Sequence, residues 1–243
     1  MPETLILLHG FAGTGRMWDP VIDRLDGERY RALAPDIRGH GSAHARRPID
    51  FQTCAQDIVD LVGDTATLCG YSMGGRIALH AALLAPQRFD RLVLVATTAG
   101  ISDDVAQRAA RAAQDEQLAR FMETHSIDEF ADRWSSQPLF AGTPPESAAF
   151  WRSTILDNHP TALATAMRGL GAGWMVPLWD RLGELTMPTT IVVGETDQRF
   201  RSFGERLQAS LPDATTTVIP GVGHGIPRDT PREMAAILNG LDR

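Results

Sequence analysis

The sequence predicts an α/β fold: a mostly parallel sheet flanked by helices, with a helical cap inserted between two strands. Short apolar or β-branched runs alternate with helical patterns along the chain, which is typical of βαβ units. The alternation stops between about residues 100 and 180, where the patterns are helical, and then resumes. We therefore expect a core of residues 1–100 and 181–243 and a cap of residues 101–180.

The individual elements follow from local composition. Residues 5–8 and 92–95 are entirely apolar, and residues 189–193 are entirely β-branched, as expected of buried strands. Residues 77–85 are rich in alanine and end before Pro86, which predicts a helix. The strands are expected at 5–8, 31–34, 66–69, 92–95, 189–193 and 215–218. The cap helices are expected at 103–123, 127–135, 147–158 and 161–170.

Composition narrows the possible partners. The 243 residues can form one sizeable core with a small insertion, and the 43% apolar and 22% charged contents are ordinary for a globular protein. The net charge of -7, without a run of basic residues, argues against a nucleic-acid partner. All 23 basic residues are arginine, a bias that GC-rich coding also produces, so each arginine has to be judged by its position.

The cysteines and the apolar pattern predict a cytoplasmic protein. Cys54 and Cys69 lack the spacing of metal ligands, and two reduced thiols are the default in that compartment. The first residues lead directly into a strand, and no apolar stretch reaches the length of a membrane span. We expect no membrane association, no metal, and a monomer or a small homo-oligomer.

The most informative motif is a nucleophile elbow at Gly70, Ser72 and Gly74. In this Gly-x-Ser-x-Gly pattern the flanking glycines let the chain turn sharply from a strand into a helix, with the serine at the tip. The expected strand at 66–69 and the expected helix at 77–85 supply the required context. Ser72 is therefore the candidate nucleophile or base.

A catalytic serine needs a histidine, and the histidine needs an acid. Asp197 follows the expected strand at 189–193, and His224 follows the last expected strand, so both lie at the sheet edge where ligands bind. The chain order serine, acid, histidine is also the order found in hydrolases that carry this Gly-x-Ser-x-Gly elbow. Asp197 is the favoured acid, because it lies farther onto its loop; Glu195 and Asp229 remain alternatives.

Two backbone N–H groups are expected to form an oxyanion hole. One belongs to Met73, the residue after the serine. The other is expected from Phe11, in the glycine-rich loop that follows the first strand.

Arginines indicate an anionic substrate. Arg76 lies one helical turn after Ser72, within reach of anything bound at the serine. In the cap, Arg108 and Arg111 are three residues apart and share a helix face. An ion pair of Arg111 with Asp115, at position i+4, is at least as good an explanation of that arginine as anion binding.

With these residues placed, the chain resembles the α/β-hydrolase superfamily over nearly its whole length. More narrowly it resembles the family of 2-succinyl-6-hydroxy-2,4-cyclohexadiene-1-carboxylate synthases of the menaquinone pathway. The segments that carry the resemblance are His9 to Gly13, Gly70 to Arg76, Arg108 with Arg111, Trp134 to Phe140, Arg168 to Gly171, Pro177 to Leu182 and Gly194 to Phe200.

The resemblance implies a lyase rather than a hydrolase. Such an enzyme eliminates pyruvate from 2-succinyl-5-enolpyruvyl-6-hydroxy-3-cyclohexene-1-carboxylate, with the serine, histidine and aspartate acting as a proton relay and with no metal or organic cofactor. The substrate is a small polycarboxylate. The family's substrate contacts, carried over by position, are Tyr71, Arg76, Arg111, Trp134 and Arg152.

Two segments depart from the family's pattern. Residues 96–100 lack the expected acid and serine-proline-glycine turn, and residues 225–229 lack the second histidine and the glutamate that usually follow the catalytic histidine. A carboxylesterase that acts through an acyl-serine therefore remains an alternative. A catalytically silent binding protein is a third reading, against which the complete set of serine, acid and histidine argues.

Overall fold

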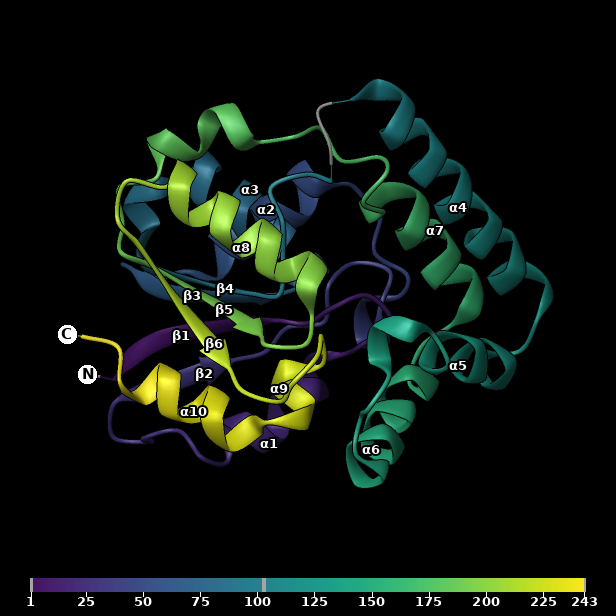
Figure 1. The fold of residues 1–243 in the computed structure, drawn as a ribbon, viewed down its shortest axis with the longest axis horizontal. Helices are drawn as coiled ribbons and strands as arrows, with labels where there is room; N and C mark the ends of the chain where they lie inside the picture. The colour runs from purple at the N-terminus through teal and green to yellow at the C-terminus, as the bar shows by residue number, and fades with distance from the viewer. Residues whose placement is uncertain (1, 102–103, 243) are drawn as a thin grey trace.

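The chain forms a six-stranded sheet in which all neighbouring strands are parallel, in the order β2-β1-β3-β4-β5-β6 (Figure 1). The computed structural model describes residues 2–101 and 104–242. Every expected strand is confirmed within a few residues: β1 Glu3–Leu8, β2 Tyr30–Leu33, β3 Ala66–Tyr71, β4 Phe89–Val95, β5 Thr189–Gly194 and β6 Ala214–Ile219.

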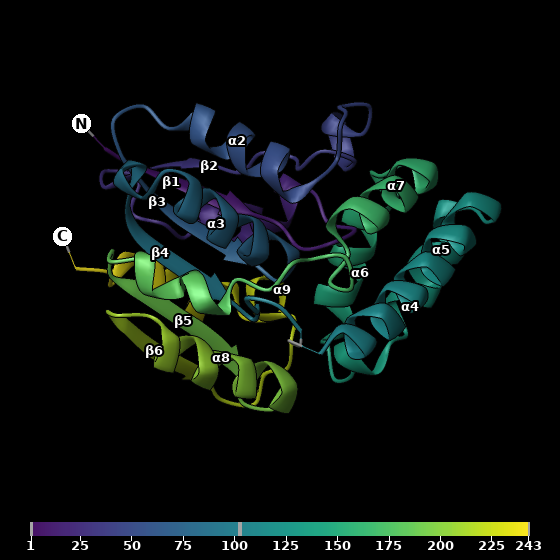
Figure 2. The ribbon, with the colours of Figure 1, turned by 90° about the horizontal axis from the view of Figure 1, so that it is seen from above.

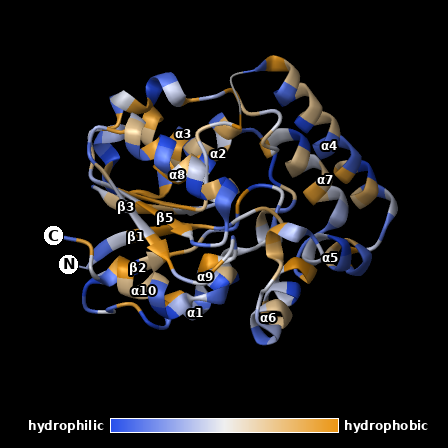
Figure 3. Ribbon diagram, in the orientation of Figure 1, coloured by the Kyte–Doolittle hydropathy of each residue, from blue (hydrophilic) through white to orange (hydrophobic). Residues whose placement is uncertain are grey.

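The sheet separates two apolar cores, because successive side chains along a strand point to opposite faces. In β1, Ile6 and Leu8 face one core while Leu5 and Leu7 face the other, and all four are fully buried. Figure 1 shows the resulting layers of helix, sheet and helix, and Figure 3 shows the apolar strands between them. The first core packs against α2 Phe51–Leu61, α3 Met73–Leu84 and α8 Gln198–Ser210, and the second against α1 Asp19–Ile22 and α10 Pro231–Asn239.

The segment between β4 and β5 is a helical cap that lies beside the sheet (Figure 2). Its helices are α4 Val105–Thr124, α5 Ile127–Ser135, α6 Pro145–Leu156 and α7 Pro160–Leu170. The first residue of the helix expected at 103–123 lies outside the described residues. Among those described, no helix is both long and apolar enough to cross a membrane.

The third cap helix begins and ends two residues earlier than expected. Pro145 occupies its first turn, where the missing N–H costs no hydrogen bond. At the other end the Asn158 amide donates to the carbonyls of Thr154 and Ile155, at 3.0 and 3.2 Å, and to that of Ala12 at 3.1 Å. A side chain thus caps α6 and joins it to the loop after β1.

The two ends of the cap are hydrogen-bonded to each other at a narrow neck. The Leu178 N–H donates to the Ala99 carbonyl at 2.7 Å, and the Trp179 indole N–H donates to the Gly100 carbonyl at 3.1 Å. The neck lies close to the expected boundaries at 100 and 181, which stay a prediction.

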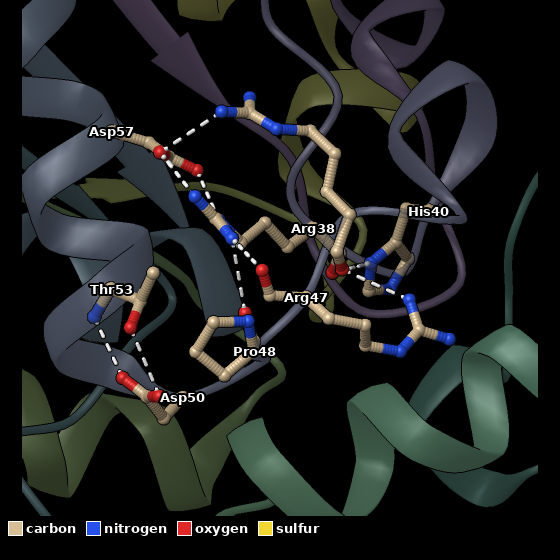
Figure 4. A network of polar contacts seen from close by, with 8 residues as sticks. Arg38, His40, Arg47, Pro48, Asp50, Thr53 and Asp57 are labelled. Carbon is tan, nitrogen blue, oxygen red and sulfur yellow. Dashed lines mark hydrogen bonds and ion pairs between the residues drawn. The ribbon is translucent and has the colours of Figure 1, made fainter.

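A polar network holds the long connection between β2 and α2 (Figure 4). Arg38 makes a bidentate ion pair with Asp57 of α2, at 2.5 and 2.8 Å, and donates to the carbonyls of Arg47 and Pro48, at 2.8 and 3.3 Å. The connection carries His40, whose buried ring lies 5.5 Å from the ring of Phe11. The network therefore supports the loop that is expected to supply the oxyanion hole.

Candidate active site

Ser72 lies at the tip of a strained turn between β3 and α3. Its φ of 52° falls in the left-handed region, which non-glycine residues adopt at a cost of the order of 1–3 kcal/mol. The turn is tight enough that a Cβ on Gly70 would approach the Gly74 carbonyl oxygen to 2.5 Å. The Thr97 hydroxyl donates to the Ser72 carbonyl at 2.7 Å and braces the turn from β4.

The structure brings Ser72, His224 and Asp197 together. The Ser72 hydroxyl lies 3.1 Å from His224 Nε2, and His224 Nδ1 lies 2.8 Å from Asp197 Oδ2. The other Asp197 oxygen accepts the Phe200 N–H at 3.2 Å, which makes Asp197 the N-cap of α8. Helix α8 therefore fixes the carboxylate that orients the histidine.

The environment keeps His224 neutral and in one tautomer. A carboxylate can only accept, so Nδ1 carries the proton and Nε2 is free to accept the serine proton. Burial is the main cause that lowers the pKa of His224 below its ordinary 6.5, and the hydrogen bond to Asp197 opposes it. A neutral imidazole is the form that a general base requires at pH 7.

The two alternative acids are engaged elsewhere. Glu195 Oε2 accepts the Gly221 N–H at 2.7 Å on the exposed side of the loop. Asp229 pairs with Arg228, at 2.8 Å. The geometry thus favours Asp197 as the partner of His224.

The expected oxyanion donors flank the serine. Met73 is the first residue of α3, so its N–H has no partner within the helix. Phe11 follows Gly10 in a turn closed by the Gly13 N–H on the Gly10 carbonyl, at 3.1 Å. Both Gly10 and Phe11 line the same cavity as Ser72. Two backbone donors at these places are suited to a developing oxyanion.

A cavity of about 500 Å³ lies between the cap and the carboxyl ends of the strands. Tyr71 and Trp134 line it, and the Tyr71 ring lies 5.3 Å from the ring of His224. The Trp134 indole N–H is buried, and in the described part of the chain it has no hydrogen-bond partner. This N–H is therefore available to donate to a molecule bound in the cavity. Among the described residues no cluster of His, Cys, Asp or Glu could hold a metal ion.

Arg76 lies on the cavity wall one turn after Ser72 and is only 8% exposed. Its guanidinium donates to the Leu170 carbonyl at 2.7 Å and stacks over the ring of Phe51, 5.5 Å from the centroid. Within the described residues, no carboxylate lies within 4.0 Å of it. Burial lowers its pKa from 12.5 to about 10, and the cation of Arg111 adds to that effect.

The position of Arg111 suits either of the two alternatives, an ion pair or a ligand contact. Its Nε pairs with Asp115 at 2.7 Å, one helical turn away, and its side chain also lines the cavity. The second Asp115 oxygen accepts the Gly173 N–H at 3.0 Å. The buried carboxylate thus holds Arg111 at the cavity wall while the guanidinium keeps donors for a ligand.

Arg152 does not reach the cavity. It lies on α6 and pairs with Asp128 and Asp132 of α5, at 3.0 and 3.1 Å. The structure therefore does not bring it together with Arg76 and Arg111, although the resemblance placed it among the substrate contacts.

Two cavity arginines escaped the sequence reasoning. Arg199 and Arg133 line the cavity, from α8 and α5 respectively. Burial and the nearby cation of Arg111 lower the pKa of Arg199. Closeness in the sequence to predicted site residues could have indicated both arginines. Arg199 follows Asp197 by two residues, and Arg133 directly precedes Trp134.

The fold, the nucleophile elbow and the geometry of Ser72, His224 and Asp197 define the class of protein. The family model described as alpha/beta hydrolase family matches residues 5–237, and the chain belongs to this family.

Individual relatives give a more specific comparison than the family as a whole. The chain is 30% identical to a putative 2-succinyl-6-hydroxy-2,4-cyclohexadiene-1-carboxylate synthase of Bacillus subtilis (strain 168), covering 98% of this chain and 89% of that protein. The solved structure of MenH from S. aureus matches with a TM-score of 0.91 and 28% identity, covering 98% of this chain and 92% of that one. A pimeloyl-[acyl-carrier protein] methyl ester esterase of Nitrosomonas europaea is 27% identical, covering 98% of this chain and 94% of that protein.

Proposed function

We propose that the protein is a lyase that eliminates pyruvate from 2-succinyl-5-enolpyruvyl-6-hydroxy-3-cyclohexene-1-carboxylate in menaquinone biosynthesis. The relatives named as synthases of the elimination product support this proposal over nearly the whole chain. The observation that carries it is Arg76, a buried cation beside Ser72 with no carboxylate partner among the described residues. A substrate carboxylate would complete it.

The cavity favours a polyanion over a neutral ester. Arg76, Arg111, Arg133 and Arg199 all line it, in a protein whose net charge is -7. Guanidinium groups gathered in one partly buried space repel one another and lose hydration, so their arrangement costs free energy without a bound anion. Bidentate pairs with carboxylates would offset that cost.

The triad would act as a proton relay. Ser72 Oγ gives its proton to His224 Nε2 and takes the proton from the substrate carbon next to the succinyl ketone. The ketone oxygen becomes an enolate, which the N–H groups of Phe11 and Met73 would stabilise. The enolate then collapses to form a ring double bond at the deprotonated carbon, the existing ring double bond shifts by one position toward the carbon that bears the enolpyruvyl group, and the bond from that carbon to the enolpyruvyl oxygen breaks. The proton held by His224 returns to the departing enolate, which leaves as pyruvate.

The alternative is a carboxylesterase, favoured by one specific observation. The Ser72 hydroxyl points at His224 Nε2 with the same geometry that activates a nucleophile, and a methyl ester esterase is among the relatives. In that reaction Ser72 Oγ attacks the ester carbonyl, and the two backbone donors hold a tetrahedral intermediate.

One experiment separates the two reactions. The enzyme is given the enolpyruvyl substrate while pyruvate release is followed with a coupled lactate dehydrogenase assay, and in parallel it is given a nitrophenyl ester. Ser72→Ala serves as the control for contaminating activity. The proposal requires pyruvate release that Ser72→Ala abolishes; fast ester turnover without pyruvate would overturn it.

Composition bears on where the enzyme works and on what it binds. We propose that it works in the cytoplasm as a monomer or small homo-oligomer, and that its partner is a small polycarboxylate rather than a nucleic acid. The net charge of -7 supports the last point.

A further inference from the structure

Arg228 is a buried arginine that lies four residues after the catalytic histidine. It belongs to the short helix α9, Ile226–Asp229, and is 5% exposed. Its Nε pairs with Asp229 Oδ1 at 2.8 Å. The attraction within a buried ion pair rarely offsets the free energy of desolvating its two charges. The ion pair alone therefore does not explain why Arg228 is buried.

Other contacts of Arg228 are with the cap. The guanidinium donates through Nη2 to the Thr143 hydroxyl at 2.6 Å. Its central carbon lies 3.9 Å from the ring centroid of Trp151 and 4.8 Å from that of Phe140. Thr143 lies just before α6, Trp151 on α6, and Phe140 on the 3₁₀ turn Pro138–Phe140. One side chain from the histidine loop therefore holds three residues of the inserted segment.

The cap residues that Arg228 contacts also form a wall of the site. Phe140 and Trp151 line the cavity, and their rings lie 4.2 Å apart in a T-shaped arrangement. The Phe140 ring lies 6.1 Å from that of His224. Arg228 thus packs behind the aromatic wall that covers the catalytic base.

We propose that Arg228 is a positioning residue that fastens cap residues 138–151 to the loop of His224 and so holds the aromatic wall over the base. The inference goes beyond the proposed reaction, because it concerns the placement and charge of His224 whichever substrate is bound. It also offers a use for segment 225–229, where the sequence departs from the family's pattern.

The charge of Arg228 has a second effect on the histidine. The groups that face His224 are Asp197, which raises its pKa, and Arg199 and Arg228, which lower it together with burial. The fourth is Tyr71, whose ring contacts the imidazole. Asp229 faces Arg228 and is paired with it. Loss of the Arg228 cation should therefore raise the pKa of His224.

Three variants separate the tether from the charge. Arg228→Met removes both. Thr143→Val removes the bond from Arg228 to the cap, together with the bonds of the hydroxyl to the Phe140 carbonyl and to Asp229, and leaves the ion pair of Arg228 with Asp229 in place. Thr165→Val is the matched control, because the Thr165 hydroxyl bonds the Thr161 carbonyl within its own helix. The two readouts need no substrate: amide hydrogen exchange of residues 138–156, and an NMR titration of the His224 imidazole.

Thr143→Val should accelerate exchange in 138–156 by at least about fivefold, as expected when one hydrogen bond or more is lost, and leave the pKa of His224 unchanged. Arg228→Met should accelerate the same exchange and raise that pKa, because a cation that disfavours the imidazolium is lost. Thr165→Val should change neither.

Unchanged exchange in Thr143→Val would overturn the tether, and an unchanged His224 titration in a folded Arg228→Met would overturn the effect of the charge. If Arg228→Met does not fold, Arg228→Lys replaces it. That variant should accelerate exchange without moving the titration, and unaltered exchange would again refute the tether. Because neither readout involves turnover, these results stand apart from any failure of the proposed lyase reaction.

Discussion

Replacing Arg76 by methionine should weaken the binding of an anionic substrate and at the same time stabilise the fold. Methionine keeps most of the volume of the side chain and removes its charge. The two effects have the same origin, because the protein buries a cation that, among the described residues, has no carboxylate in direct contact; Asp115 acts on it only from a distance.

The structure gives the size of both effects. Burial lowers the pKa of Arg76 from 12.5 to about 10, which means that the folded state disfavours the cation at pH 7. At about 1.4 kcal/mol for each pKa unit, the cost is of the order of 3 kcal/mol. Losing the hydrogen bond to the Leu170 carbonyl offsets about 1 kcal/mol of the gain, which leaves a net stabilisation of about 2 kcal/mol. The lost charge-assisted contact should raise the dissociation constant about 10- to 100-fold.

Urea unfolding measures the first effect, and the KM or Kd of the enolpyruvyl substrate measures the second. Arg120→Met is the matched control, because Arg120 is 74% exposed and, in the described part of the chain, pairs with Glu116 alone. It should change stability by less than about 1 kcal/mol and leave binding unaltered. A less stable Arg76→Met enzyme with unchanged substrate affinity would refute the reasoning and make Arg76 a structural residue.

Three further predictions follow from the site. Asp197→Asn should lower kcat by about four orders of magnitude, as the equivalent change does in serine proteases, whereas Glu195→Gln should stay within about twofold because Glu195 only accepts the Gly221 N–H; the reverse ranking would reassign the acid. Because the pKa of His224 lies below 6.5, kcat/KM should persist at pH 6.5 and fall only at lower pH, and a pH-rate profile with its acid limb above 6.5 would contradict this. Arg152→Ala should change KM less than about threefold, since its pairs with carboxylates are partly exposed; a tenfold rise would show that the cap brings Arg152 to the substrate.

The core could be predicted from the sequence because its signals are local. A parallel strand buried on both faces must be a largely apolar run, as the central strands β1, β3, β4 and β5 are. The edge strands β2 and β6 are partly exposed and contain polar residues, so their signal is the alternation of strands with helices. The elbow is also local, since Gly70, Ser72 and Gly74 have to satisfy one sharp turn. The family's chain order then led from Ser72 to Asp197 and His224.

The cavity wall could not be predicted in the same way, because it depends on how the cap docks. Arg152 and Arg133 lie on helices whose sequence allows either to face the core. Packing of the cap turns Arg152 toward acids of α5 and leaves Arg133 on the cavity. For Arg111 the sequence left an ion pair and a ligand contact as alternatives, and the side chain is long enough for both geometries. Arg228 bonds Thr143, which is 85 residues away in the chain and carries no sequence signal of the contact.

The neck that joins the cap to the sheet has an evolutionary consequence. Its two ends meet through the bonds from Leu178 to Ala99 and from Trp179 to Gly100, beside strands β4 and β5 that pair directly with each other. The insertion can therefore lengthen, shorten or be exchanged as a cassette without altering the register of the sheet. Selection can therefore change the cap residues that line the cavity, such as Arg111 and Trp134, while Ser72, His224 and Asp197 keep their places on the core.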